Sequence, residues 1–231
     1  MDQPWEIVNK DWTNRYLLDF KKKWGNYQNG PRIMNDTLYK LFKKYPNHKN
    51  TGEIAAKVTI LGRTYATGIE RHAVKHKKLP PMNVITNFLV KNGKRIDKLF
   101  KPLIKIQERL TIKKLETVIK VHGDFVSLLS VIMRKNNNPR SFASKYMHFH
   151  CKAVPIFDQI ANSSLKSKKY GMYPLNMPGM KRLIQRFNKP KDMDNEYYQF
   201  CVRFYAMYED LKAHKVTETN VRSIDHYLLS D

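Results

Sequence analysis

Apolar residues return at the spacing of an α-helix along nearly the whole chain, in segments of unequal length. Trp12, Tyr16 and Phe20 share one helical face, and Leu99 and Leu103 share another. No segment alternates with the two-residue period of a β-strand, and no unit repeats at a fixed interval as it would in a helical repeat array. The sequence therefore predicts an all-α, globular, multi-helix protein with short connections.

Glycine, proline and asparagine residues mark where these helices end. Asn136 to Pro139 is the sharpest break, because asparagines followed by proline favour a turn and then a new helix start. After it we expect a helix of roughly ten residues, an extended segment over 152–156, and another helix that begins near Asp158. Glycines 68 and 93 are each expected at a helix end. Further helices are expected over 51–68, 111–134, 196–212 and 221–229.

The charge of the chain indicates the kind of partner it has. The 231 residues include 43 Lys and Arg against 20 Asp and Glu, which gives a formal net charge of +23. A polyanion is the natural counter-surface for such a chain, so we expect DNA or RNA. The length suits one domain over 1–231, or two lobes over about 1–110 and 111–231 with an active site at their seam.

Other features indicate where the protein works. The longest apolar run, near 125–133, is about half of what a membrane-spanning helix needs, so no membrane partner is expected. Asp2 and Glu6 stand where a secretory signal would be basic and then apolar. Two cysteines, Cys151 and Cys201, do not form a disulfide framework, and we expect reduced, buried thiols. The prediction is a cytoplasmic, nucleoid-associated protein with no obligate protein partner.

The segment SFASKYMHFHCKAVPIFDQIA, residues 141–161, places ionisable groups in apolar and aromatic sequence. Lys145 and His148 fall on one side of its predicted helix. A lysine desolvated there favours its neutral form and becomes a candidate nucleophile, whereas a lysine on a helix is more often a solvated surface group. Asp158 stands at an N-cap or first-turn position, where the helix N-terminus keeps a carboxylate ionised. Ordinary helix capping explains Asp158 equally well.

This order of elements resembles the helix-hairpin-helix DNA glycosylase superfamily, most nearly its 8-oxoguanine DNA glycosylase branch. In that family an aspartate that closes a Pro-Val-Asp type sequence is catalytic, and VPIFD matches it with one additional residue between Pro155 and Asp158. The phrases KVTILGRTYATGIERH and VRSIDHYLL also look like parts of bacterial proteins assigned an 8-oxoguanine-glycosylase-like fold. The Gly-x-Gly of the family's hairpin is absent, and NNNPRS stands in its place.

The resemblance implies that a target nucleotide is flipped out of duplex DNA and its base excised. Asp158 would stabilise the oxocarbenium-like sugar, and Lys145 would attack C1′ with strand cleavage to follow, or only contact the DNA. The excised base is expected to be an oxidised purine, in repair, or a bulky phage-type modified cytosine such as glucosylated hydroxymethylcytosine, in antiviral defence. The alternatives are a non-catalytic basic DNA- or RNA-binding protein and a nuclease, which the lack of an evident carboxylate cluster for magnesium disfavours.

No cofactor or metal is expected. Two cysteines cannot hold a four-cysteine iron–sulfur cluster, and His148, His150 and Cys151 offer cramped zinc ligands with no evident fourth. His148 either contacts the departing base or packs in the core against a backbone partner. Between residues 71 and 120, 14 Lys or Arg face three acids, a density that suits phosphate contacts. The candidate base-binding residues are His148, Tyr65 and Phe157, and the candidate DNA-backbone residues are Arg140, Ser141, Arg63, Arg71, Lys166, Lys168 and Lys169.

Overall fold

The computed structural model describes residues 18–20, 22–23, 32–65, 67–74, 79–106, 109–135, 137–167, 184–186, 193–216 and 219–229. Within these ranges the chain is helical, with one isolated antiparallel bridge between Ala73 and Met133 and no strand, so the predicted all-α class is confirmed. The helices are α2 Arg32–Lys44, α3 Thr51–Thr64, α4 Ile69–His72, α5 Pro81–Lys91, α6 Gly93–Ile104, α7 Ile112–Ser130, α8 Arg140–His150, α9 Gln159–Ser167, α12 Asn195–Ala213 and α13 Val221–Leu229.

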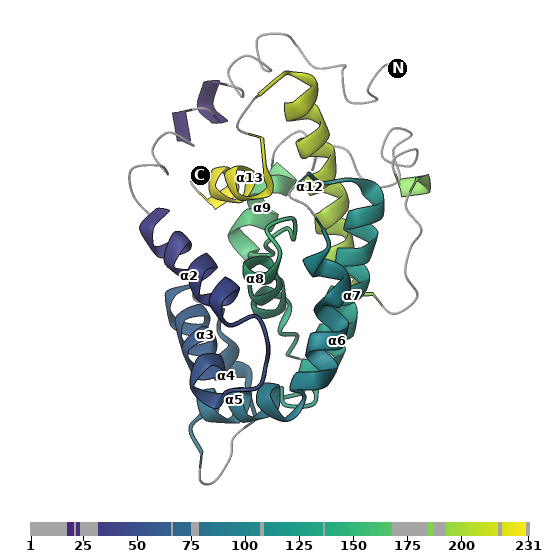
Figure 1. Ribbon diagram of the computed structural model, residues 1–231. Coiled ribbons are helices and arrows are strands. Elements are labelled where there is room, and N and C mark those ends of the chain that lie inside the picture. The colour runs from purple at the N-terminus through teal and green to yellow at the C-terminus, as the bar shows by residue number, and fades with distance from the viewer. Residues whose placement is uncertain are drawn as a thin grey trace.

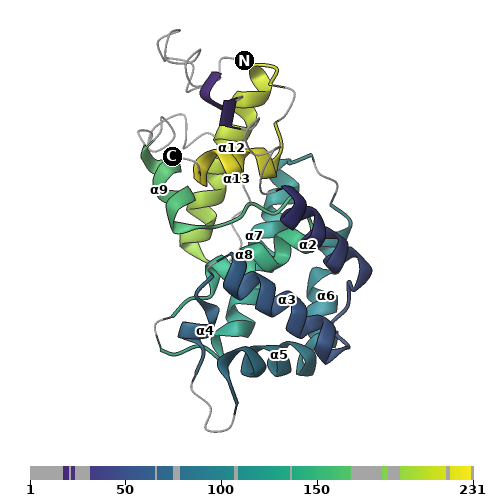
Figure 2. The same ribbon diagram turned by 90° about the vertical axis from the view of Figure 1, so that its left-hand side faces the viewer.

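Helix α8 lies in the middle of the fold. It packs against α2, α3, α6 and α7, and Figures 1 and 2 show these helices around it. Every residue from Phe142 to Phe149 is buried, so α8 has no solvated face in spite of its lysine and histidines. α9 follows α8 in the chain and packs against α12 and α13. The part of the 141–161 segment that forms α8 is therefore enclosed by helices from both halves of the chain.

The predicted helix boundaries around α8 and beyond are close to those in the structure. α8 begins directly after Pro139, as expected. The segment between α8 and α9 is not helical, but it opens with a turn at Lys152 and Ala153, where an extended conformation was expected. α7 ends at Ser130, four residues before the expected end, because the chain turns there and its next residues bond back toward Ala73. The helices predicted over 196–212 and 221–229 are α12 and α13. Trp12 and Tyr16 lie outside the described residues.

The two glycines predicted at helix ends have different roles. α3 starts at Thr51 as expected, with Asn50 as its N-cap, but it ends at Thr64, before Gly68. Gly68 has φ +67°, a left-handed conformation, and it precedes the short helix α4. Gly93 stands at a helix end as expected, because α5 ends at Lys91 with Asn92 as its C-cap. Gly93 is also the first residue of α6, and it lies against the backbone of His48.

We expect Gly93→Ala to destabilise the protein by about 1–3 kcal/mol, the range for overpacking in a tight core. A Cβ at this position would lie 2.2 Å from the carbonyl oxygen of His48. That backbone cannot retreat easily, because the His48 ring is 2.7 Å from the Asp97 carboxylate and 2.9 Å from the Tyr146 hydroxyl. Urea unfolding measures the loss, and Gly52→Ala, near only the Asn50 side chain, is the matched control. Equal stability of the two variants would contradict this account.

Neither Cys151 nor Cys201 forms a disulfide and both are buried, which confirms the expected reduced thiols. Among the helices of the described residues, none is both long and apolar enough to cross a membrane.

Candidate active site

Lys145 and Asp158 form an ion pair at the junction of α8 and α9. The Lys145 Nζ lies 2.8 Å from Oδ2 of Asp158. The lysine side chain is only 4% exposed, while the aspartate side chain is 23% exposed, so solvent reaches the pair from the carboxylate side. The two residues singled out in the sequence are thus in direct contact, and Lys145 is not a solvated surface lysine.

The carboxylate is fixed by the start of α9 and by α8 itself. Asp158 accepts a hydrogen bond on Oδ1 from the Ile160 amide at 2.9 Å, so it caps α9 with one oxygen and pairs with Lys145 through the other. The preceding residue, Phe157, donates its backbone N–H to Oγ of Ser144 at 3.0 Å. Ser144 precedes Lys145 on α8, so one helix positions both members of the pair. This role of Ser144 in positioning the residue before Asp158 was not predicted from the sequence.

The lysine has a second acceptor at the end of α3. Its Nζ donates to the backbone carbonyl oxygen of Tyr65 at 3.0 Å, and Tyr65 is the C-cap of that helix. The last carbonyls of a helix lack intrahelical partners and favour a cation. Lys145 therefore lies at the C-terminus of α3 while Asp158 lies at the N-terminus of α9, and both helix ends stabilise the charges of the pair.

Polar side chains from α2, α13 and the C-cap of α3 form a hydrogen-bonded set next to the Lys145–Asp158 pair. Asp225, 1% exposed, accepts from the Arg222 guanidinium, which also donates to Oδ1 of Asn35 at 3.0 Å. The Tyr65 hydroxyl donates to the same Asn35 oxygen. Burial raises the pKa of Asp225 above its ordinary value, the positive charges of Arg222 and Lys145 oppose that rise, and the negative charge of Asp158 adds to it.

Asp225 belongs to the VRSIDHYLL segment, yet the sequence did not single it out. The available signal was its place beside Ile224, Tyr227 and Leu228 on the buried part of α13, three residues after Arg222. A carboxylate predicted among apolar residues needs a partner in the fold. Asn35 gave no comparable signal.

Two of the three candidate base-binding residues, His148 and Phe157, are buried in the core, and Tyr65 is partly buried. His148 is fully buried, with Nδ1 2.8 Å from the Val154 carbonyl oxygen and Nε2 hydrogen-bonded to the Tyr39 hydroxyl. Burial is the main cause that lowers its pKa to about 3. Phe157 is 4% exposed and packs against Phe200. His148 therefore has the geometry of a packed core histidine with a backbone partner, and Tyr65 contributes to the site through its carbonyl and its bond to Asn35.

The candidate DNA-backbone residues fall in different surroundings. Arg140 forms ion pairs with Asp194 at 2.7 Å and Glu196 at 2.6 Å, and its side chain is 17% exposed. A phosphate would have to compete with both carboxylates for that guanidinium. Ser141 is half-buried in the first turn of α8. Arg63, Arg71 and Lys166 are exposed, with Arg63 3.7 Å from Glu70, whereas Lys168 and Lys169 lie outside the described residues.

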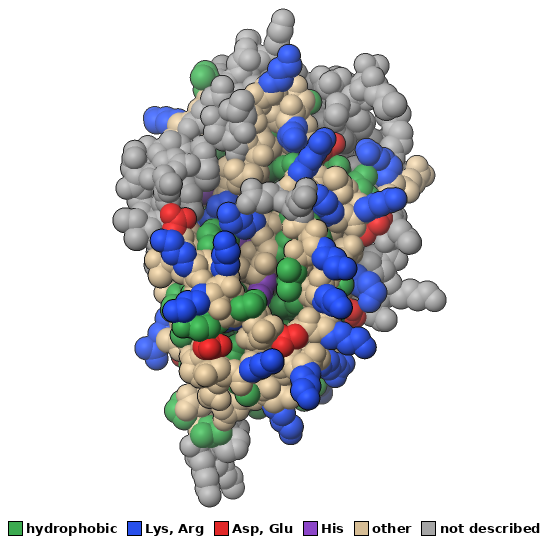
Figure 3. Space-filling view, viewed as in Figure 1, with side chains coloured by type: hydrophobic (Ala, Val, Ile, Leu, Met, Phe, Trp, Pro, Cys, Tyr) green, Lys and Arg blue, Asp and Glu red, His purple; other side chains and the backbone are tan. Residues whose placement is uncertain are grey.

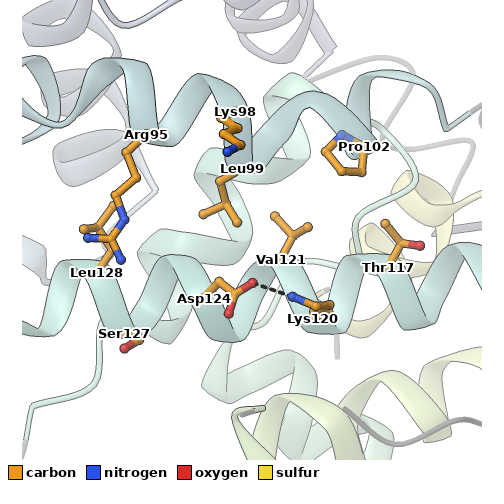
Figure 4. A pocket seen from close by; sticks show the side chains of 10 residues that line it. All are labelled: Arg95, Lys98, Leu99, Pro102, Thr117, Lys120, Val121, Asp124, Ser127 and Leu128. Carbon is orange, nitrogen blue, oxygen red and sulfur yellow. Dashed lines mark hydrogen bonds and ion pairs between the residues drawn. The ribbon is translucent and has the colours of Figure 1, made fainter. Parts of the chain in front are cut away.

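A basic groove runs between α6 and α7. Its volume is about 590 Å³. Figure 4 shows Arg95 extending from α6 toward α7, Lys98 on the same helix, and Lys120 on α7, which pairs with Asp124 at 3.0 Å. Leu99, Pro102, Val121 and Leu128 line it with aliphatic surface. Figure 3 shows Lys and Arg side chains gathered on this part of the molecule. The three basic residues of the groove, Arg95, Lys98 and Lys120, come from the stretch 71–120 whose charge density stood out in the sequence, and none of the lining residues belongs to the Lys145 site.

Within the described ranges, no group of three His, Cys, Asp or Glu side chains lies close enough together to hold a metal ion. His150, one of the possible zinc ligands, instead stacks on the His48 ring with centroids 5.5 Å apart.

Fold and site together define an all-α protein in which a buried lysine pairs with a partly exposed aspartate between two helix ends. The chain belongs to the HI_0787_N family, whose model, described as an N-terminal domain, matches residues 13–154. No curated protein and no solved structure matches the chain. The matched region contains Tyr65 and Lys145 but ends before Asp158, so the ion pair joins the family's domain to the part of the chain that follows it.

Proposed function

We propose that this protein is a DNA glycosylase that excises a modified base at the Lys145–Asp158 pair. The observation that carries the proposal is the 2.8 Å contact between a lysine ammonium enclosed by helices and a carboxylate that solvent still reaches. A solvated ion pair would have little chemical consequence, but a desolvated one places a latent amine and an anion at one point. These two groups can act together in the cleavage of an N-glycosidic bond, the anion on the developing positive charge of the sugar and the amine as a nucleophile.

Asp158 would act on the sugar. As the bond from C1′ to the base lengthens, the sugar gains positive charge, and a carboxylate fixed nearby stabilises that charge more in the transition state than in the ground state. Asp158 is held by the Ile160 amide and by Lys145, so it needs little reorganisation to act. Its partial exposure leaves a side from which a flipped nucleotide can approach.

Lys145 would act in one of two ways. As a nucleophile, Lys145 first gives a proton to Asp158, the base nearest to Nζ. Its neutral nitrogen then forms a bond to C1′ while the nucleobase leaves with the electrons of the glycosidic bond and takes the proton from Asp158, which is thereby ionised again as the sugar gains positive charge. The adduct rearranges to an imine, from which strand cleavage follows. As a cation, it orients Asp158 while water attacks C1′, and an abasic site remains.

The groove between α6 and α7 supports DNA as the substrate. Arg95, Lys98 and Lys120 line it, and phosphate contacts from such residues fix a duplex without reading its sequence. The expected substrates are a duplex with an oxidised purine and a duplex with a bulky modified cytosine. A non-catalytic nucleic-acid binder would use the same groove but would not need the enclosed ion pair.

The test uses labelled duplexes that carry 8-oxoguanine, uracil, an alkylated base or glucosylated hydroxymethylcytosine. The proposal expects strand breaks after hot alkali with one of them, and none with Asp158→Asn. Retention of DNA without breaks would identify a binder, and metal-dependent breaks without alkali would identify a nuclease. Borohydride then separates the two roles of Lys145, since only an imine is trapped, and Lys145→Gln must abolish the trapped product.

The salt dependence of DNA binding tests the groove separately. We expect Arg95→Met and Lys98→Met each to weaken duplex binding and to reduce the slope of log K against log salt by about 1, because each removes one phosphate contact. Fluorescence anisotropy over a salt series measures this slope. Lys40→Met on α2, an exposed lysine outside the groove, has the same charge change and should preserve it. Equal slopes for all three variants would remove the groove from the interface.

A further inference from the structure

A hydrogen-bonded chain connects the last helix to the ammonium of Lys145. Asp225 and Arg222, both on α13, are ion-paired, and Arg222 donates to Asn35 on α2. The same Asn35 oxygen accepts the hydroxyl of Tyr65, whose carbonyl oxygen accepts from Lys145. Four helix segments that are distant in sequence therefore meet through side chains at the acceptor of the lysine.

The side chains that form these hydrogen bonds are largely buried. Asn35 and Asp225 are each 1% exposed, and the side chain of Arg222 is 15% exposed. In such surroundings each hydrogen bond is strong, and removing one partner leaves the other unsatisfied in a medium that solvates it poorly. These hydrogen bonds therefore hold the side chains of Asn35, Tyr65 and Arg222 in one arrangement.

Asp225 is more than an anchor for Arg222. Its Oδ1 is buried and has no hydrogen-bond partner among the described residues. A carboxylate kept only to fix Arg222 on the same helix would not need to be this deeply buried, and each such unsatisfied atom in a native fold calls for an explanation. Lys145 and Asp158 both act electrostatically on Asp225, which places the carboxylate within the field of the ion pair.

We propose that Asn35, Arg222 and Asp225 are positioning residues, which hold the Tyr65 carbonyl and so fix where the ammonium of Lys145 lies relative to Asp158. Their catalytic consequence rests on the proposed glycosylase function, whereas the effect on Lys145 does not. The proposal also gives α13 a role in this site. Lys145 lies in the region matched by the family model, whereas α13 lies after that region in the sequence.

The first measurement reads Lys145 directly and needs no substrate. The full chain is reductively methylated with formaldehyde and cyanoborohydride, and peptide mass spectrometry compares Lys145 with the exposed Lys98 as internal reference. We expect Asn35→Ala and Arg222→Met to raise the labelling rate of Lys145 at least about threefold, because a loosened ammonium spends more time away from its two acceptors. Ser223→Ala, which removes the hydrogen bonds between the Ser223 hydroxyl and the backbone of Asn220 just before α13, is the matched control.

The second measurement separates positioning from folding and from DNA binding. On a substrate that the wild type cleaves, Asn35→Ala and Arg222→Met should slow single-turnover base release by about 10- to 100-fold, the scale of a misplacement near 1 Å, with duplex affinity unchanged. Asp225→Asn should act in the same direction, and Arg222→Lys, which keeps the charge beside Asp225, should recover part of the rate. Ser223→Ala should release the base at the wild-type rate.

The outcomes are distinguishable. If Lys145 labels in Asn35→Ala and Arg222→Met as slowly as in Ser223→Ala, the positioning role is overturned whether or not the protein excises a base. If labelling of Lys145 rises in these variants but the wild type releases no base from any duplex, the positioning role is supported and the proposed glycosylase function is wrong. If one of the two variants does not fold, the other replaces it, because Asn35→Ala and Arg222→Met both remove the hydrogen bond between Arg222 and Asn35.

Discussion

Asp158→Asn is expected to slow base release by about 100- to 1,000-fold, the scale found when one preorganised group that stabilises transition-state charge is removed. The substitution keeps the size of the side chain and an oxygen able to accept from the Ile160 amide, so the start of α9 should persist. It removes the base nearest to the Lys145 ammonium, which is also the negative charge that faces the sugar in the proposed mechanism. Single-turnover kinetics on the identified substrate measure the loss.

This variant needs a control for the ion pair itself, because it leaves Lys145 enclosed without its carboxylate. Chemical denaturation should show a lower free energy of unfolding, and kinetics are therefore compared at a temperature where both proteins remain folded. Asp19→Asn makes the same substitution in a more exposed ion pair, the one between Asp19 and Lys23. It should change neither stability nor rate appreciably. A wild-type rate in Asp158→Asn would mean that no base is excised at this pair.

The second large effect is a loss of thermal stability in acid. His122 and His148 are fully buried, and burial is the main cause that lowers their pKa values to about 4 and about 3. Each therefore binds a proton more weakly in the folded chain than in the unfolded chain, whose histidines titrate near 6.5. Stability is fully present above pH 6.5 and falls as the pH drops toward these lowered values.

The expected size follows from the width of that window. Near pH 4.5 each of the two histidines contributes a loss of about 2–3 kcal/mol, so Tm should fall by roughly 10–20 °C between pH 7 and pH 4.5. Burial also lowers the pKa values of His48 and His150, which adds to the loss, whereas the raised pKa of Asp225 acts in the opposite direction. Burial opposes but does not cancel the lowering of the Asp194 pKa by its hydrogen bond with Arg140, and the resulting loss begins only below the ordinary aspartate pKa, at a lower pH than this range. Circular dichroism melts over this range measure the change.

A histidine variant tests the assignment. His148→Gln should have a lower Tm at pH 7, because it disturbs the bonds to Val154 and Tyr39, yet its Tm should decline less between pH 7 and pH 4.5. His72→Gln, which removes an exposed histidine, should keep the full decline. If His148→Gln loses as much Tm on acidification as the wild type, the loss has another origin.

Local sequence was sufficient to predict much of the fold and the centre of the site. The start of α8 after Pro139 and the start of α9 after Asp158 follow from turn and capping preferences, which act over a few residues. Lys145 stood out because its neighbours are apolar. A lysine in such a segment either lies at the surface by exception or finds a buried partner, and Asp158 was the nearest acidic residue that follows it in the chain.

The roles of other residues were not predictable in this way. Arg140 was expected to face a phosphate, but the fold brings Asp194 and Glu196 to it from a helix more than 50 residues away. Gly93 was expected to end a helix, and its contact with His48 depends on how two helices meet. Such contacts join residues far apart in sequence, and no local preference encodes them.

The sequence by itself determined the helices, their breaks, the charge, and the placement of a lysine and an aspartate on either side of one short non-helical segment. Only the tertiary structure decided that these two side chains touch, that the Tyr65 carbonyl is the second acceptor of the lysine, and that Asn35, Arg222 and Asp225 stand behind it. Helix propensity and capping act within a few residues of the chain. Burial and long-range hydrogen bonds exist only once the whole chain has packed.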